Sequence, residues 1–268
     1  MSAEPLVTAS SPRRERQTHA SAVLGRWLPL RHEATSDARL RLICFAHAGG
    51  GAWSFGGWAK LWPGVEVCAI ELPGRGARYG EAPLVDQADL LARLTPRIAR
   101  LHDRPFVLFG HSLGARIAYG LAAELQARGG AAPLGVIVSA GRPPGAAPHE
   151  LTGRETDVAL RVWLERMGGT PREVLENEEL MRLTLPVLRA DLALLSSGDR
   201  LAAPRLDCDL FAFGGDRDPM LPREGIMAWS RFTRRRFSCD LFEGGHFYLH
   251  DRPEPVAARL AALFDTMT

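Results

Sequence analysis

Segment 109–114 constrains the fold of this chain more than any other. The apolar run 105–109 before it has the pattern of a buried strand in a parallel sheet. The stretch 115–128 after it carries apolar residues at spacings of three and four, which predicts a helix. Between them stands G-x-S-x-G, the pattern of a nucleophile elbow. We therefore expect a strand–turn–helix unit that exposes the hydroxyl of Ser112.

The glycines of this motif have a steric purpose. A serine on a strained strand-to-helix turn brings backbones close together, so Gly110 and Gly114 have to lack side chains. The helix N-terminus behind Ser112 also favours negative charge that develops beside it. Three fixed letters can occur by chance in a glycine-rich turn, but the strand before them and the helix after them favour a nucleophile.

Strand and helix patterns alternate along most of the chain. Strands separated by helices predict an α/β fold with a mostly parallel, doubly wound sheet. We expect strands at 41–45, 65–70, 105–109, 133–139, 208–213 and 236–242, and helices near 52–62, 86–101, 115–128 and 222–231 and from 253. Between about 142 and 203 the pattern is helical without a strand. This insertion is predicted to form a lid over the carboxyl edge of the sheet, where such folds bind ligands.

Length and composition indicate one globular domain. The 268 residues, 46% of them hydrophobic and 24% charged, suit a single α/β domain with an insertion. We expect a disordered tail at 1–22 and the hydrolase-like domain at 23–268. No run of about 18 apolar residues predicts a membrane span, and the N-terminus lacks the apolar centre of a signal peptide.

Charge and cysteine usage narrow the functional class. A net charge of +2 gives no argument for a nucleic-acid partner. The four cysteines fall in apolar, strand-like runs without metal-type spacing, which predicts buried reduced thiols in a cytoplasmic protein: Cys44, Cys68, Cys208 and Cys239. We expect no metal and no cofactor.

A serine nucleophile needs a base, and in α/β-hydrolases the residue order is Ser, then Asp or Glu, then His. Three histidines follow Ser112. His246 lies in a glycine-rich turn directly after a strand, where an imidazole can project over the sheet edge. His250 is typical of a surface residue near a helix start, and His149 lies early in the insertion. We favour His246.

The acid that orients this base is expected after strand 208–213. Two carboxylates, Asp216 and Asp218, lie in the loop there, and either could instead cap its own turn. The residue before Pro219 is restricted to an extended conformation, which favours Asp218 and leaves Asp216 as the alternative. The tetrahedral intermediate needs two N–H donors. One is expected from Leu113, the residue after the nucleophile, and the other from the glycine-rich loop 46–51.

Together these motifs resemble the type II thioesterases of polyketide and nonribosomal peptide pathways, over roughly residues 39–265. The resemblance rests on FAHAGG at 45–50, ELPGRGAR at 71–78, FGHSLGA at 109–115, LPVLRAD at 185–191, GGDRDP at 214–219 and GGHF at 244–247. It implies an α/β-hydrolase fold and the triad Ser112, Asp218 and His246. The family usually has proline where this chain has Ala46, and proline carries no N–H, so the resemblance implies Ala48 as the second oxyanion donor.

The resemblance also implies a substrate and a partner. The substrate is an acyl group on the phosphopantetheine arm of an acyl or peptidyl carrier protein, met transiently, with no nucleic acid and no membrane involved. Hydrolysis would remove aberrant or stalled acyl groups. Carrier proteins are typically acidic near the arm, so the candidate contacts are His47, Arg75, Arg78, Arg116 and Arg142. The alternatives are solvated surface arginines, a small-molecule carboxylesterase with the same triad, and a binding protein with a relic site.

Overall fold

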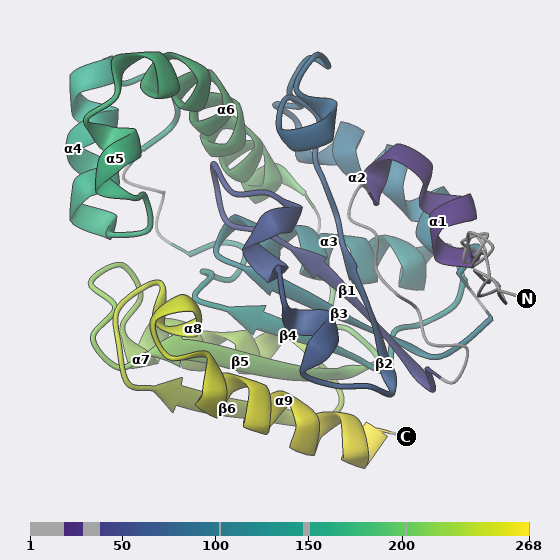
Figure 1. Ribbon diagram of the computed structural model, residues 1–268. Coiled ribbons are helices and arrows are strands. Elements are labelled where there is room, and N and C mark those ends of the chain that lie inside the picture. Colours follow the sequence, from purple (N-terminus) through teal and green to yellow (C-terminus); the bar gives the residue numbers. More distant parts are fainter. Residues whose placement is uncertain (1–18, 29–37, 102, 147–150, 202, 268) are drawn as a thin grey trace, which may run out of the picture.

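The computed structural model describes residues 19–28, 38–101, 103–146, 151–201 and 203–267. Within them, six strands form one sheet in the order β2-β1-β3-β4-β5-β6, and every neighbouring pair is parallel (Figure 1). The strands are β1 Leu40–Phe45, β2 Val65–Ala69, β3 Phe106–His111, β4 Gly135–Ser139, β5 Asp209–Gly215 and β6 Phe237–Phe242. Each lies at the place that the sequence predicts, because each is a short apolar run bounded by turn residues. The α/β prediction with a parallel sheet is confirmed.

Helices connect most of the successive strands and cover both faces of the sheet. They are α1 His19–Leu24, α2 Gln87–Ile98, α3 Leu113–Ala127, α4 Asp157–Met167, α5 Arg172–Leu175, α6 Glu178–Ser197, α7 Arg223–Met227, α8 Tyr248–Asp251 and α9 Pro253–Met267. Among the described residues, none of these helices is long and apolar enough to span a bilayer. Asp86 caps α2 by accepting hydrogen bonds from the N–H groups of Ala88 and Asp89.

One predicted helix is wrong. The stretch 52–62 forms two short 3₁₀ turns, Ala52–Phe55 and Trp58–Lys60, in place of a continuous α-helix. Gly56 and Gly57 stand between them, and Gly57 has a φ of +89°, which interrupts helical hydrogen bonding. The aromatic spacing that suggested a helix instead places Phe55, Trp58 and Trp62 against the sheet.

Alternate side chains of the strands enter two separate cores. On one face Ile43 and Leu108 pack with α1, α2, α3 and Trp229. On the other, Leu42 and Phe109 pack with the 3₁₀ turns, α8 and α9. A sheet covered on both sides explains why its strands are continuously apolar.

The helices α4, α5 and α6 stand together beyond one edge of the sheet (Figure 1). They share a small apolar core of their own that includes Leu160, Met181 and Leu188. All three lie inside the predicted insertion 142–203, of which 147–150 and 202 fall outside the described residues.

Residues 1–18 of the predicted tail 1–22 lie outside the described residues. Residues 19–22 belong to α1, and Ala20 is fully buried against the core.

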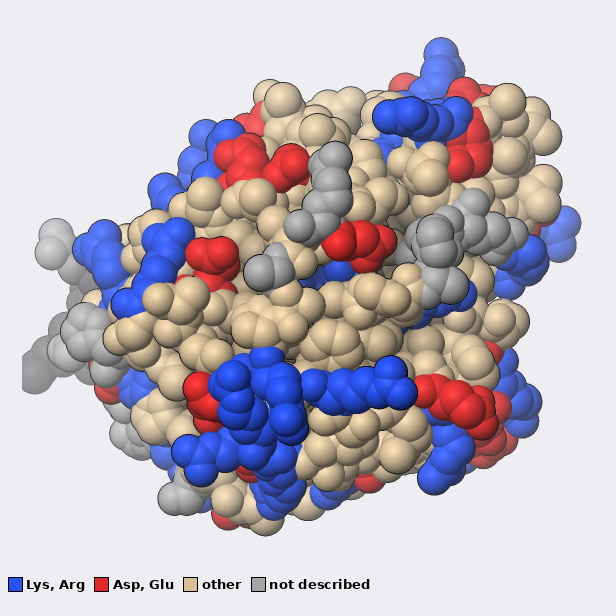
Figure 2. Space-filling model, turned by 180° about the vertical axis from the view of Figure 1, so that it is seen from behind, with Lys and Arg blue, Asp and Glu red and all other residues tan. Residues whose placement is uncertain are grey.

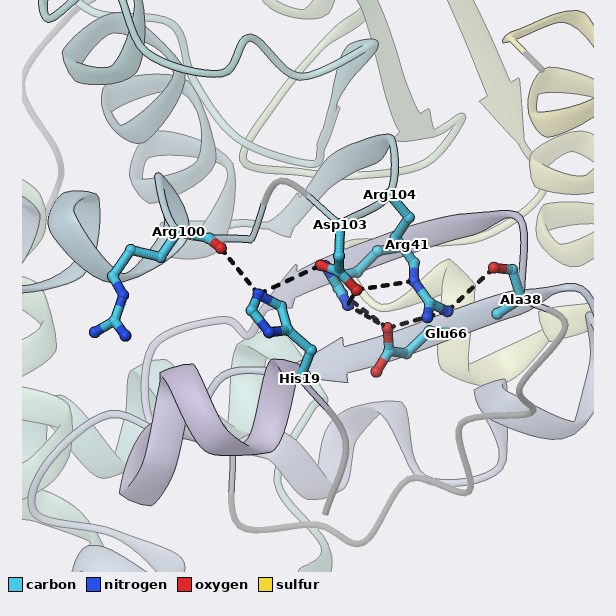
Figure 3. Close-up of polar contacts among 7 residues, drawn as sticks. All are labelled: His19, Ala38, Arg41, Glu66, Arg100, Asp103 and Arg104. Carbon is cyan, nitrogen blue, oxygen red and sulfur yellow. Dashed lines mark hydrogen bonds and ion pairs between the residues drawn. The ribbon is translucent and has the colours of Figure 1, made fainter. Parts of the chain in front are cut away.

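A polar network lies at the amino ends of β1, β2 and β3 (Figure 3). Arg41 is fully buried and binds Glu66 of the neighbouring strand at 2.7 Å and Asp103 at 2.9 Å. Arg104 lies beside both carboxylates, and His19 of α1 approaches Asp103 at 3.6 Å. This network ties α1 and three strands together at the end of the sheet where the strands begin.

Candidate active site

Ser112 lies at the sharp turn between β3 and α3. Its backbone has φ +56° and ψ −112°, a strained conformation for a residue with a side chain. A Cβ on Gly110 would lie 1.9 Å from the carbonyl oxygen of Gly114, and a Cβ on Gly114 would lie 2.0 Å from that of Phe45. Both positions therefore require glycine, as the steric argument expects. The turn lifts the Ser112 side chain above the carboxyl edge of the sheet.

The structure brings His246 and Asp218 together. The Nδ1 of His246 lies 2.7 Å from Oδ2 of Asp218, and both side chains are buried. The other oxygen of Asp218 accepts a hydrogen bond from the N–H of Met220 at 2.8 Å. Asp216 points elsewhere and accepts a hydrogen bond from the N–H of Gly244 at the surface. Asp218, and not Asp216, therefore orients the imidazole.

Two cavities meet at Ser112 and His246. The smaller, of about 30 Å³, extends past Arg116, Arg142, Leu192, Leu195, Met220 and Leu221. The larger, of about 300 Å³, extends past His47, Gly49, Trp53, Val174, Leu188 and Phe247. Both are also lined by Ala48 and by Trp163 and Met167 of α4, so the inserted helices form their roof. The Ser112 hydroxyl has no hydrogen-bond partner among the described residues, as is common in hydrolases without substrate.

Two backbone N–H groups near Ser112 have no acceptor among the described residues. Leu113 is the first residue of α3, so its N–H has no acceptor within the helix. Ala48 lines both cavities beside Ser112, and nothing in the described part of the chain accepts a hydrogen bond from its N–H. An oxyanion needs two such N–H donors without an acceptor of their own.

Two further histidines border this site, and both are neutral. Burial, followed by the charges of His250, His246 and Arg75, lowers the pKa of His47 to about 3. Burial also lowers the pKa of His111 well below its usual value. The Nδ1 of His111 lies 2.8 Å from the Ser139 hydroxyl. The low pKa of His47 therefore disfavours a cationic contact of this side chain with a carrier at neutral pH.

A family model described as a thioesterase domain matches residues 40–264. The chain belongs to the thioesterase family. It is 36% identical to the thioesterase PikA5 of Streptomyces venezuelae over 85% of this chain and 82% of that protein. It is 35% identical to the gramicidin S biosynthesis protein GrsT of Aneurinibacillus migulanus over 81% of this chain and 85% of that protein. Its fold is similar to that of BorB, a type II thioesterase from the borrelidin biosynthetic cluster, with a TM-score of 0.78 and 34% identity over 87% of this chain and 96% of that one.

In this thioesterase, two of the predicted carrier contacts are buried in ion pairs. Arg75 binds Asp191 at 2.6 Å, and the Arg75 side chain is 9% exposed. Arg78 binds Glu81 at 2.6 Å and stacks over the ring of Trp27 at 4.1 Å. Both guanidinium groups are held by this chain's own groups, so the geometry disfavours a direct contact with a carrier protein. Sequence patterns do not reveal this because the Arg75 partner is 116 residues away.

The other two predicted arginine contacts line the smaller cavity. Arg116 of α3 is buried and binds Asp199 at 2.8 Å. Arg142 is half-buried and donates a hydrogen bond to the carbonyl oxygen of Met220 at 2.8 Å. Both thus lie at this cavity more than at the open protein surface.

Exposed arginines gather elsewhere, at 231 and 234–236, around the turn Ala228–Phe232 and the start of β6. Figure 2 shows basic side chains collected on the back of the molecule. Arg236 directly precedes β6, whereas the carboxyl ends of the strands face the cavities, so this basic surface begins at the opposite end of the sheet.

Several site residues escaped the sequence reasoning. Ser139 accepts or donates a 2.6 Å hydrogen bond with Tyr248, which continues the buried chain from His111. Asp191 belongs to the segment 185–191 that carries the family resemblance, but its pattern alone indicates no role. Within the described residues, no cluster of three histidine, cysteine, aspartate or glutamate side chains is suited to hold a metal ion.

Proposed function

We propose that this thioesterase is a serine hydrolase that cleaves acyl thioesters from the phosphopantetheine arm of acyl or peptidyl carrier proteins. Its role would be editing, the removal of aberrant or stalled acyl groups during polyketide or nonribosomal peptide synthesis. The observation that carries the proposal is the buried His246–Asp218 pair, which shares a roofed cavity with Ser112. The relatives named for biosynthetic thioesterases support the substrate class.

The proposed reaction has two steps. The Ser112 hydroxyl attacks the thioester carbonyl as His246 takes its proton, and Asp218 holds the imidazole through its 2.7 Å hydrogen bond. The Leu113 and Ala48 N–H groups stabilise the oxyanion. The C–S bond then breaks, and His246 returns the proton to the departing thiolate. In the second step His246 takes a proton from water, the hydroxide attacks the acyl-enzyme, and Ser112 regains its proton as the carboxylic acid leaves.

The two cavities suit the two parts of such a substrate. We assign the phosphopantetheine arm to the larger cavity, which has the exposed indole of Trp53 among its lining residues. The acyl group belongs in the smaller one, which Leu192, Leu195 and Leu221 make largely apolar. Arg116 and Arg142 would then contact polar atoms of the acyl group.

We further propose that the carrier protein docks only transiently, because each carrier has to return to its synthase after editing. The reaction would take place in the cytoplasm. Cys44 and Cys68 are buried free thiols, which is consistent with a reducing compartment.

One experiment tests this function against a carboxylesterase with the same triad. The kcat/KM is measured for one acyl group presented on a carrier protein, on a short thiol mimic and as an oxygen ester, with Ser112→Ala as the control. The proposal expects the highest kcat/KM for the carrier-bound thioester. Equal or faster turnover of the oxygen ester would assign the protein to the general carboxylesterases.

A further inference from the structure

The loop that carries Ala48 is held by a buried ion pair. Asp191 comes from the inserted helix α6, and Arg75 comes from the loop after β2. We propose that Arg75 and Asp191 are positioning residues that fix the oxyanion loop 46–51 and couple the oxyanion site to the roof of the cavity. The inference rests on the proposed function, because it concerns how that site stabilises its oxyanion.

Four hydrogen bonds define the arrangement. Oδ2 of Asp191 accepts from the N–H of Gly49 at 2.7 Å and from Arg75 at 2.6 Å. Oδ1 of Asp191 accepts from the other terminal nitrogen of Arg75 at 2.6 Å. Arg75 also donates to the carbonyl oxygen of Gly50 at 2.9 Å. The pair therefore holds the loop through one N–H donor and one carbonyl acceptor.

This loop needs an external restraint because its second half, 49–51, consists of three consecutive glycines. Gly49 has a φ of +78°, and glycine has the largest choice of backbone conformations of any residue. The N–H that Asp191 binds belongs to the peptide unit directly after Ala48. Without that hydrogen bond and the contact of Arg75 with Gly50, the backbone on the carboxyl side of Ala48 would be free to shift and to carry the Ala48 N–H away from Ser112. Asp191 therefore helps to fix the position of the Ala48 donor.

The charge of the pair suits this position. A lone carboxylate near the oxyanion would oppose the negative charge that develops there. Arg75 cancels it through a bidentate contact, and the planar guanidinium matches the two carboxylate oxygens as lysine cannot. Both side chains are buried, so solvent does not weaken the contact. The loop thus receives a strong acceptor without an uncompensated charge.

The position of Asp191 connects the loop to the inserted helices. Leu188 and Leu192 flank Asp191 on α6, and they line the larger and the smaller cavity respectively. Displacement of α6 would open the cavity and withdraw the carboxylate from Gly49 in the same motion. The oxyanion site is therefore complete only when the roof of the cavity is in place.

The test compares two variants of the pair with a control at the other end of the sheet. Asp191→Asn keeps the shape of the side chain and removes its charge, and Arg75→Lys keeps the charge and removes the bidentate contact. Glu66→Gln removes a carboxylate from the buried Arg41 ion pair far from the cavities and controls for lost stability alone. The readouts are kcat, KM and the inhibition constant of a trifluoromethyl ketone analogue of the acyl group, which binds as an oxyanion on Ser112.

We expect Asp191→Asn to lower kcat by about 10- to 100-fold, below the loss from removing one oxyanion donor outright. The ketone should bind weaker by a similar factor, while KM changes by less than about threefold. Arg75→Lys should act in the same direction with a smaller effect. Glu66→Gln should leave all three values near those of the unmodified protein.

Two results would overturn the inference: kcat and ketone binding within about twofold of the unmodified protein in folded Asp191→Asn, or equal losses in Glu66→Gln. If Asp191→Asn does not fold, Arg75→Lys decides by the same readouts. The proposed function fails separately. In that case the ketone does not inhibit the unmodified protein, or Ser112→Ala hydrolyses thioesters as fast as the unmodified protein does.

Discussion

The two ends of the parallel sheet both carry buried polar groups, but they hold them differently. At the amino ends, Arg41 is paired with Glu66 and Asp103, and its guanidinium has acceptors on both sides (Figure 3). At the carboxyl ends, the ring nitrogens His47 Nδ1 and His111 Nε2 are buried without a hydrogen-bond partner among the described residues. The guanidinium at the amino ends thus has its hydrogen-bond acceptors, whereas buried ring nitrogens at the carboxyl ends lie around a cavity without a partner among the described residues.

This difference indicates that the polar groups at the amino ends of the strands stabilise the fold, whereas those at the carboxyl ends serve the chemistry of the site. A buried ion network with every partner present locks strands in register. Burial acts to raise the pKa of Asp103, but the hydrogen bond and charge of Arg41 outweigh it and lower that pKa to about 2. The strained backbone and unpaired donors at Ser112 are costly for folding, and such strain gathers at functional sites. We therefore expect substitutions at the two ends to separate stability from turnover.

The largest expected effect is at the nucleophile. Ser112→Ala should lower kcat by about 10⁴-fold or more, because the acyl-enzyme can no longer form. The thermal midpoint should change little, since alanine meets the same backbone strain as serine. Hydrolysis of a carrier-bound thioester, followed next to a thermal melt, checks both. Activity close to that of the unmodified protein would refute a serine mechanism.

The second prediction contrasts two aspartates that are two residues apart. Asp218→Asn should lower kcat by about 10³- to 10⁴-fold, because the amide favours the wrong tautomer of His246. Asp216→Asn is the matched control and should change kcat by less than about threefold, since Asp216 binds the N–H of Gly244 and lies 3.8 Å from Arg217 rather than contacting His246. Steady-state kinetics on both variants checks this. A larger loss of kcat from Asp216→Asn than from Asp218→Asn would mean that Asp218 does not orient His246 during turnover.

The third prediction concerns the opposite end of the sheet. Arg41→Met should lower the free energy of unfolding by about 3 kcal/mol, because it leaves Glu66 and Asp103 without their main cation. The kcat of the folded fraction should stay within about twofold. Arg104→Met removes a partly exposed arginine with longer contacts and should cost about 1 kcal/mol or less. Urea unfolding with parallel activity measurements checks both variants. A loss of kcat in Arg41→Met without a loss of unfolding free energy would contradict the separation of stability and turnover between the two ends of the sheet.

The smallest expected effect is a pH dependence. The pKa of His47 is about 3 in the folded chain and near 6.5 when unfolded, so below pH 6.5 only the unfolded chain binds this proton. The stabilising contribution is complete above pH 6.5 and falls as the pH drops. His47→Gln should flatten the decline in unfolding free energy between pH 6.5 and 5, by at most about 1.4 kcal/mol per pH unit. His250→Gln, at an exposed neighbour, should flatten it less, and an unchanged slope in His47→Gln would contradict the buried neutral state.

Sequence reasoning predicts those features that depend on neighbours along the chain. The elbow glycines, the six strands and the Asp86 cap follow from local patterns and sterics. The helix expected at 52–62 is wrong because Gly56 and Gly57 divide the stretch into two 3₁₀ turns, although its tryptophans have a helical pattern. The partner of Arg75, Asp191, lies 116 residues away and depends on how the chain returns through space, which no local pattern contains. Pro219 favours Asp218 over Asp216 from sequence, but only the folded loop shows which of the two carboxylates contacts His246.

The most direct test of this account is labelling with a serine-directed fluorophosphonate, followed by peptide mapping and an activity assay on a carrier-bound thioester. We expect one equivalent of label, located on Ser112, and loss of activity in proportion to labelling. Ser112→Ala should take up no label. Full labelling at another residue, or activity that survives complete labelling of Ser112, would contradict the claim that the chemistry of this protein lies at the elbow.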